Sequence, residues 1–131
     1  MNKRILGTLM LVLISALAVG ACGGSTGAAT PMPGPQIILT TNPNPPVMGP
    51  VELIIDAKDA QGQPLDGANV LVLTSHTSMS GMDQRGQAAA QGNGRYTLTV
   101  ELSGMSGEWL VTVQVRKDGL NIAQDFRIEV K

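Results

Sequence analysis

Aromatic and cysteine side chains are scarce in this chain of 131 residues, which has one tryptophan, one tyrosine, one phenylalanine and one cysteine. A single cysteine cannot form a disulfide within the chain. The few rings provide no surface for stacking nucleic-acid bases, and the net charge of -1 does not suggest the basic face that nucleic acids require. We therefore expect no nucleic-acid partner. We also expect a core of valine, isoleucine and leucine, which favour strands.

Residues of the common catalytic sites are equally scarce. His76 is the only histidine, and the sequence contains no GxSxG, HExxH, P-loop or CxxC motif. Ser75, Thr77 and Ser78 are its neighbours in sequence, but adjacency along a strand does not place a base against a nucleophile. The sequence therefore predicts a protein that is not an enzyme.

Residues 1–21 have the three-part layout of a secretory signal peptide. Basic Lys3 and Arg4 precede an apolar stretch over 5–19, and the small residues 20–21 end it. A membrane-spanning helix needs roughly 20 apolar residues, which is more than this stretch offers. A cleaved leader is thus favoured over the alternative, a permanent transmembrane anchor.

The segment Val19-Gly20-Ala21-Cys22 resembles the lipobox that bacterial lipoprotein signal peptidase cleaves, with valine in place of the usual leucine. The resemblance implies that Cys22 becomes the first residue of the mature protein. It would carry a thioether-linked diacylglycerol and usually an amide-linked third chain, such as palmitate. Two or more acyl chains anchor a protein stably, and the alternative is a free thiol or an interchain disulfide. We expect an extracytoplasmic protein anchored by lipid to the cell membrane or the outer membrane.

Residues 22–35 consist of the acylated cysteine and a tether rich in Gly, Ser and Pro, a composition that cannot bury apolar surface. Residues 36–131 form the single domain. Clusters of Gly, Pro, Asn and Asp divide this domain into seven predicted strands. The strands are expected near 36–41, 51–58, 69–75, 87–91, 95–102, 108–117 and 121–130.

Apolar and polar residues alternate most clearly over 95–102, so one face of that strand is expected in the core and the other in water. The predicted inward rows are Tyr96, Leu98, Val100 and Leu102; Val51, Leu53, Ile55 and Ala57; Trp109, Val111, Val113 and Val115; and Phe126, Ile128 and Val130. The pattern predicts an all-β protein, an immunoglobulin-like antiparallel β-sandwich of about seven strands. A transthyretin-like sandwich is the alternative.

Soft donor atoms gather in two polar segments that contain glycine, 76–82 and 104–107. Methionines that serve only for packing are expected at inward strand positions, whereas these lie where strands give way to loops. Thioether sulfur and imidazole together suit Cu(I). The alternatives are flexible apolar plugs that close one end of the sandwich, or a surface that binds a protein partner. The candidate metal ligands, which must converge at one end of the sandwich, are His76, Met79, Met82 and Met105.

Short motifs in the same region together resemble the YtkA-like domain family, over about residues 48–117. Related FixH-like and copper-resistance-type sandwiches occur near copper handling and respiratory-oxidase assembly. The resemblance implies a small extracytoplasmic β-sandwich, often a lipoprotein, that handles copper or, alternatively, serves as an interaction module for an envelope protein partner. The motifs are Gly67-Ala68-Asn69-Val70, Met79-Ser80-Gly81-Met82, Gly94-Arg95-Tyr96, and Met105-Ser106-Gly107-Glu108-Trp109 before alternating valines.

Overall fold

The computed structural model describes residues 34–131, and all the regular structure in this part of the chain is β-strand. No helix within these residues is long and apolar enough to cross a membrane. The eight strands are β1 (Gln36–Asn42), β2 (Pro50–Lys58), β3 (Asn69–His76), β4 (Gln84–Gln87), β5 (Ala89–Gly92), β6 (Arg95–Glu101), β7 (Gly107–Lys117) and β8 (Leu120–Val130).

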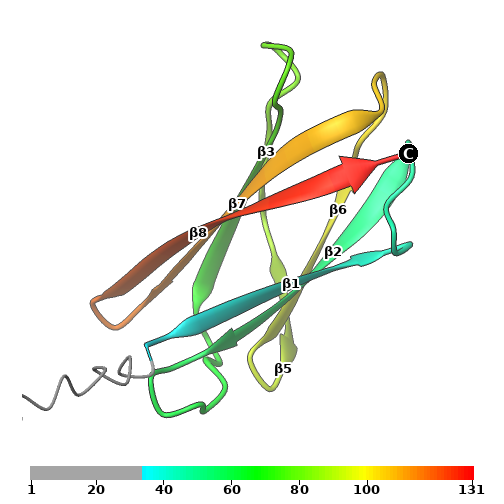
Figure 1. Cartoon of the computed structure of the whole chain (residues 1–131). Coiled ribbons are helices and arrows are strands. Elements are labelled where there is room, and N and C mark those ends of the chain that lie inside the picture. The colour runs from blue at the N-terminus through cyan, green and yellow to red at the C-terminus, as the bar shows by residue number, and fades with distance from the viewer. Residues whose placement is uncertain (1–33) are drawn as a thin grey trace, which may run out of the picture.

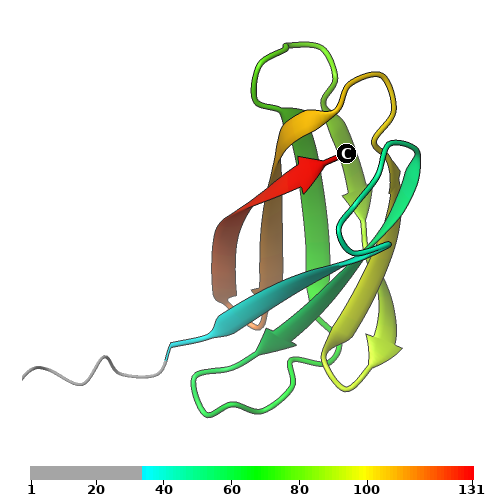
Figure 2. The same ribbon diagram turned by 45° about the vertical axis from the view of Figure 1, so that its right-hand side comes forward.

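The strands form two four-stranded antiparallel sheets that pack face to face (Figure 1). One sheet has the order β1-β2-β6-β5 and the other has the order β4-β3-β7-β8. Figure 2 shows the two layers from a second direction. The predicted all-β, immunoglobulin-like sandwich is therefore confirmed.

One predicted strand, 87–91, is wrong. The chain instead forms two short strands on different sheets, β4 and β5, and it changes sheet at Ala88. The Ala88 side chain is buried, and its N–H donates to the carbonyl oxygen of Val70 over 2.9 Å. Glycine and alanine occupy most of this crossing, so no alternation of apolar and polar residues marks the change of sheet. The domain consequently has eight strands.

The core lies between the sheets and contains the predicted inward rows of β2 and β7, whose side chains are at most 1% exposed. In the row of β6, Tyr96, Val100 and Leu102 are buried and Leu98 is partly buried. In the row of β8 only Val130 is buried, because β8 is at the edge of its sheet. Among the described residues, 34–131, every buried apolar residue lies between Ile37 and Val130. The segment 36–131 thus contains its own core and can fold independently.

The strands run between two ends of the sandwich, named here as they appear in Figure 1. The upper pole carries the loops 43–49, 77–83 and 102–106. The lower pole carries the loop 59–68 and the turns after β5 and β7. Strand β1 begins at the lower pole, since Gln36 pairs with Lys58 at the end of β2. The chain therefore enters the domain at the end opposite the methionine-bearing loops.

Tyr96 fixes the loop of the lower pole. Its hydroxyl donates to the carbonyl oxygen of Leu65 and accepts the N–H of Ala68, the latter over 2.9 Å. Gly94, two residues earlier, donates its N–H to the carboxylate of Asp66 over 2.6 Å. Both ends of the segment 65–68 are thereby tied to the beginning of β6.

Candidate functional site

The structure brings the four candidate metal ligands to the upper pole. His76 ends β3, Met79 and Met82 lie in the loop 77–83, and Met105 lies in the loop 102–106. Cys22, the predicted lipidation site, lies outside the described residues. The upper pole is therefore the candidate site that lies within the described residues.

His76 is buried, with 6% of its surface exposed, and both of its ring nitrogens make hydrogen bonds. Nδ1 accepts the N–H of Ser78 over 3.1 Å, which places the ring proton on Nε2. Nε2 then donates to the carbonyl oxygen of Ser106 over 3.3 Å. The ring also meets Trp109 edge to face, with 5.2 Å between ring centroids. In this arrangement the imidazole joins two loops, and it could bind a metal only after losing one of its hydrogen bonds.

The methionines differ in their exposure. Met79 is 46% exposed, whereas Met82 packs against the core and Met105 is partly buried. A Cβ atom placed on Gly104 would lie 2.8 Å from the Met82 methyl carbon, so this side chain lies directly on the loop that carries Met105. The two loops are in contact through this methyl group as well as through His76.

Because both ring nitrogens of His76 are hydrogen-bonded, thioether sulfur is the soft donor that remains for a metal at this pole. Between residues 34 and 131, no three or more His, Cys, Asp and Glu side chains gather in a way that could hold a metal ion. A site for a hard cation is therefore not built in this part of the chain. If a metal binds the upper pole, Met79, Met82 and Met105 are the residues to supply its ligands.

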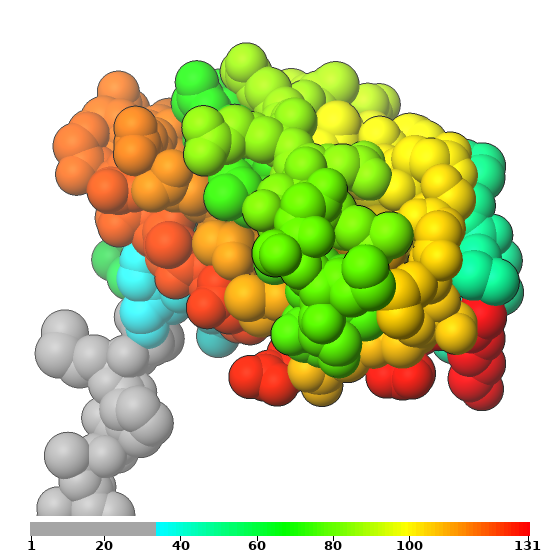
Figure 3. Space-filling model, turned by 90° about the horizontal axis from the view of Figure 1, so that it is seen from above, coloured from blue at the N-terminus to red at the C-terminus, as the bar shows by residue number. Residues whose placement is uncertain are grey.

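Two exposed residues of the upper pole escaped the sequence analysis. Val47 is 44% exposed and Met48 is 53% exposed, and both follow the prolines of the loop 43–49. This loop is joined to the neighbouring one by hydrogen bonds between Gly49 and Leu102. Figure 3 shows the pole from above, with the green loop 77–83 in the middle and the teal loop 43–49 at one end. The sequence signal that could have identified Val47 and Met48 is their position, as two apolar residues directly after a run of prolines.

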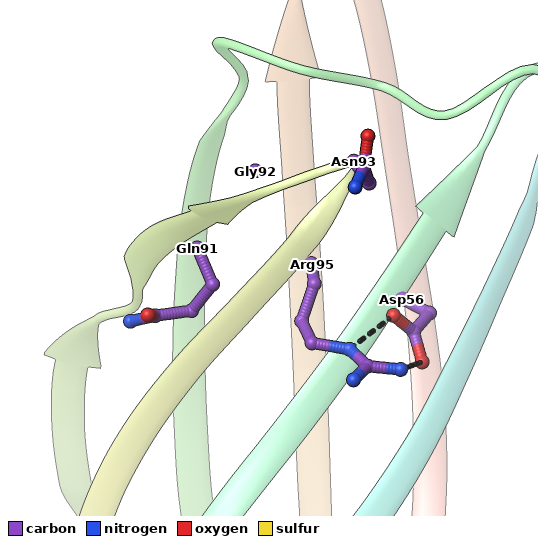
Figure 4. A pocket seen from close by; sticks show the side chains of 5 residues that line it. All are labelled: Asp56, Gln91, Gly92, Asn93 and Arg95. Atoms are coloured by element: carbon purple, nitrogen blue, oxygen red, sulfur yellow. Dashed lines mark hydrogen bonds and ion pairs between the residues drawn. The ribbon is translucent and has the colours of Figure 1, made fainter.

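A second, polar hollow of about 300 Å³ lies beside the turn between β5 and β6 (Figure 4). Arg95 points toward Asp56 and binds it through two hydrogen bonds of 2.9 and 3.2 Å. The hydrogen bond from Arg95 to Asp56, and then the charge of Asp56, raise the pKa of Arg95, so its guanidinium stays charged. Because the two charges satisfy each other in an exposed position, the hollow is a weak candidate for a ligand site.

The fold and this pole define a small immunoglobulin-like β-sandwich module. The chain belongs to the YtkA-like family, whose model matches residues 35–114. No match is found among curated proteins.

Solved structures similar to this chain are modules of larger bacterial proteins. The Escherichia coli adhesin FdeC is 26% identical, with a TM-score of 0.50 over 74% of this chain. The chitinase ChiW of Paenibacillus sp. str. FPU-7, a cell-surface-expressed multi-modular enzyme, is 17% identical, with a TM-score of 0.51 over 84% of this chain. The chain spans 31% of the adhesin and 9% of the chitinase, so each likeness concerns one part of a longer chain.

Proposed function

We propose that this protein is a lipid-anchored, extracytoplasmic module without enzymatic activity that binds an envelope protein through its upper pole. The observation that carries the proposal is the position of the chain entry. Strand β1 begins at the lower pole, while the three exposed loops that contact one another lie at the upper pole. With acylated Cys22 in the membrane, the lower pole is the tethered end and the upper pole is the free one.

The length of the tether supports this arrangement. Residues 23–35 lie between Cys22 and β1, and an extended chain spans about 3.3 Å per residue, which gives a reach of about 40 Å. This distance lets the domain stand clear of the lipid headgroups. The likeness to the adhesin and to the cell-surface enzyme supports an extracytoplasmic module in the same way.

The exposed apolar side chains support binding at the upper pole. Three of the four large apolar side chains that are exposed in the described residues lie there, namely Val47, Met48 and Met79. Apolar side chains exposed on the loops at one end of a small domain are candidates for contact with a partner, and methionine adapts its shape to such partners. The fourth, Ile38, lies on β1.

We expect Cys22→Ala to abolish acylation and to release the protein from the membrane, while the domain stays folded because the cysteine precedes all eight strands of the described residues. Partitioning of both proteins between detergent and water measures the anchor, and circular dichroism measures the fold. Equal partitioning of the two proteins into detergent would show that an apolar helix, and not lipid, is the anchor.

A photo-crosslinking amino acid at Met79 or Met48 is expected to capture an envelope protein in cells. The same amino acid at Gln91, exposed on β5 near the lower pole, serves as the control and should capture much less. Capture at Gln91 that equals the capture at both upper-pole positions would contradict the assignment of the binding surface.

Cu(I) binding is a second candidate function of the same pole, because Met82 contacts the loop that bears Met105. Three thioethers could then hold the ion, with His76 retained in its structural role. A Cu(I) competition titration of the wild type and of Met79→Ser/Met82→Ser separates the two candidates. Weaker binding by the variant supports copper handling, whereas equal titrations leave the pole as a protein-binding surface.

A further inference from the structure

The four edge strands of the sandwich differ in how far they are protected against pairing with another strand. Strands β4 and β5 have four residues each, and the pairing of β5 is interrupted by a register shift between Ala90 and Gly92. Strand β1 is bounded by Pro35 and Pro43. Short length, bulges, prolines and charged side chains are the usual means of protecting an edge. Strand β8 has only the last of these, the charged residues Asp125, Arg127 and Glu129.

Strand β8 is a regular edge of eleven residues, without glycine or proline, and pairs with β7 over its whole length without a register shift. The two-residue turn Asp118-Gly119, with φ of 46° and 80°, joins the two strands. Lys117 and Leu120 therefore form the hydrogen-bonded pair that closes the hairpin. It follows that even-numbered residues of β8 bond to β7, and odd-numbered residues turn their N–H and C=O groups to the open edge.

Lys131 supports this assignment at the end of the strand. Its N–H donates to the carbonyl oxygen of Pro46 over 3.1 Å, and its carbonyl oxygen accepts the N–H of Met48 over 2.9 Å. These bonds lie on the open side, away from β7. The loop 43–49 thus forms hydrogen bonds with the edge only at Lys131, although Pro45 and Pro46 also line a groove with Ile128 and Glu129. The outward backbone groups of the odd-numbered residues from Asn121 to Glu129 have no hydrogen-bond partner in this loop.

Apolar side chains line the same side of the domain. A groove of about 320 Å³ lies between β8 and β1, with Leu39 and Ile128 among its walls. Phe126 and Ile122 are also only partly buried along this side. A strand added to the edge of β8 would therefore both satisfy backbone groups and cover apolar surface.

We propose that β8 pairs with β8 of a second copy of this chain, antiparallel, about a two-fold axis at Phe126. The charges of the strand favour this occupant, and together with the loop 43–49 they select this register. Asp125 then lies opposite Arg127 of the second copy, and Arg127 opposite Asp125, on the outer face of a continuous eight-stranded sheet. An axis at Asp125 would place two aspartates opposite each other, and an axis at Arg127 would place two arginines together. An axis at Ile128 would also pair opposite charges, Arg127 with Glu129. It would, however, need the edge of Lys131, which is already bonded to Pro46 and Met48. The mutually hydrogen-bonded pairs lie within Ala123–Glu129, which leaves the bonds of Lys131 in place.

Both charged residues can take part in this contact. Arg127 binds Glu108 over 2.8 Å, but its side chain remains 70% exposed. Asp125 accepts the hydroxyl of Thr112 through one carboxylate oxygen, over 2.7 Å, and is itself exposed. On the inner face, Phe126 would lie beside Phe126 of the second copy, where directly opposed side chains are closest.

The dimer is compatible with two anchors in one membrane, a point that rests on the proposed function. The two-fold axis of an antiparallel strand pair is perpendicular to the sheet. Both copies therefore place the β1 sheet on the same side. Because the paired strands are antiparallel, the lower poles of the two copies lie at opposite ends of the dimer, and each tether, with its reach of about 40 Å, leads to the membrane from its own end. The upper-pole loops 77–83 and 102–106 stay uncovered because pairing uses the edge of β8, whereas Asn121 of the second copy comes to lie beside the loop 43–49 at Lys131.

Sedimentation equilibrium of the segment 36–131 tests the pairing through charge reversal. We expect the wild type to dimerise, and we expect Asp125→Arg or Arg127→Asp to weaken dimerisation about tenfold or more, because each places like charges opposite each other twice. An equimolar mixture of the two variants should associate like the wild type, since positions 125 and 127 of one variant then face opposite charges in the other. Recovery in the mixture also shows that both variants are folded.

Asp83→Arg makes the same change of charge in an exposed loop next to β4, and should leave dimerisation unchanged. A wild type that stays monomeric up to about 1 mM would overturn the proposal. Dimerisation that resists both reversals, or a mixture that fails to recover it, would also overturn it. Neither outcome bears on the lipid anchor or on the upper pole, whose tests are separate.

Discussion

Replacing Gly94 with alanine is expected to lower the free energy of unfolding by about 3 kcal/mol or more. Gly94 has a φ of 70°, a backbone conformation that costs alanine about 1 to 2 kcal/mol. The new Cβ would also lie 2.5 Å from the carbonyl oxygen of Ala57 and 2.9 Å from the backbone nitrogen of Leu65. Backbone atoms cannot move aside as a flexible side chain can. Moreover, the carbonyl oxygen of Gly94 accepts the N–H of Ala57 over 2.8 Å, so the clash would occur where the two backbone segments are hydrogen-bonded to each other.

Gly92→Ala is the matched control, two residues earlier. Gly92 has a φ of 86°, but a Cβ there would meet nothing within 4 Å. Its substitution should therefore cost only the backbone strain, about 1 to 2 kcal/mol. Urea unfolding of both variants, followed by the fluorescence of Trp109, gives the two values. Equal losses would show that crowding at the junction contributes nothing and that strain alone explains the glycine.

The same junction explains why the family motif Gly94-Arg95-Tyr96 has its form. The glycine passes close to the backbone of β2 and of the loop 59–68, and Tyr96 ties that loop through its hydroxyl. At the upper pole, Gly107 has a φ of 120°, and a Cβ there would lie 3.3 Å from the ring of His76. Both motifs thus hold a loop onto the sandwich.

Much of the fold could be predicted because β2, β6 and β7 each bury one face. Where every second side chain is apolar, as from Val51 to Ala57, the pattern fixes the inward face without any knowledge of partners. The crossing at Ala88 gives no such pattern, because residues 86–90 are glycine and alanine apart from Gln87, and both short strands lie at sheet edges. The change of sheet depends instead on contacts with residues that are distant in sequence, such as the hydrogen bond between the Ala88 N–H and the carbonyl oxygen of Val70.

For the candidate site, the sequence could predict the position but not the roles of the individual residues. The segments that carry Met79 and Met105 each join the upper ends of strands, so the order of strands suffices to place them at one pole. The role of His76 could not be predicted in this way. Its hydrogen bonds depend on the conformations of Ser78 and Ser106, which belong to different loops. The sequence shows a histidine among soft donors, and the structure shows a ring whose nitrogens are already used.

Truncation of Trp109 to alanine is expected to cost about 3 to 5 kcal/mol, as large-to-small changes in a core do. Trp109 is 1% exposed and is the largest fully buried side chain of the described residues. It also donates its indole N–H to the carbonyl oxygen of Met105 over 3.3 Å and packs against the His76 ring. A small domain has about 5 to 15 kcal/mol of stability in total, so this single loss removes much of it. Chemical unfolding followed by far-ultraviolet circular dichroism measures the change without relying on the removed fluorophore.

Trp109→Phe separates the two contributions of the side chain. Phenylalanine keeps an aromatic ring in the core but cannot donate to Met105, so the expected loss is smaller than that of alanine and includes about 1 kcal/mol for the hydrogen bond. The wild type should emit at the short wavelengths of a buried indole, since Trp109 is the only tryptophan. Emission typical of water-exposed indole, or a loss below about 1 kcal/mol for alanine, would contradict the inward position of Trp109. The upper pole would then lack the support on which His76 and the loop 102–106 rest.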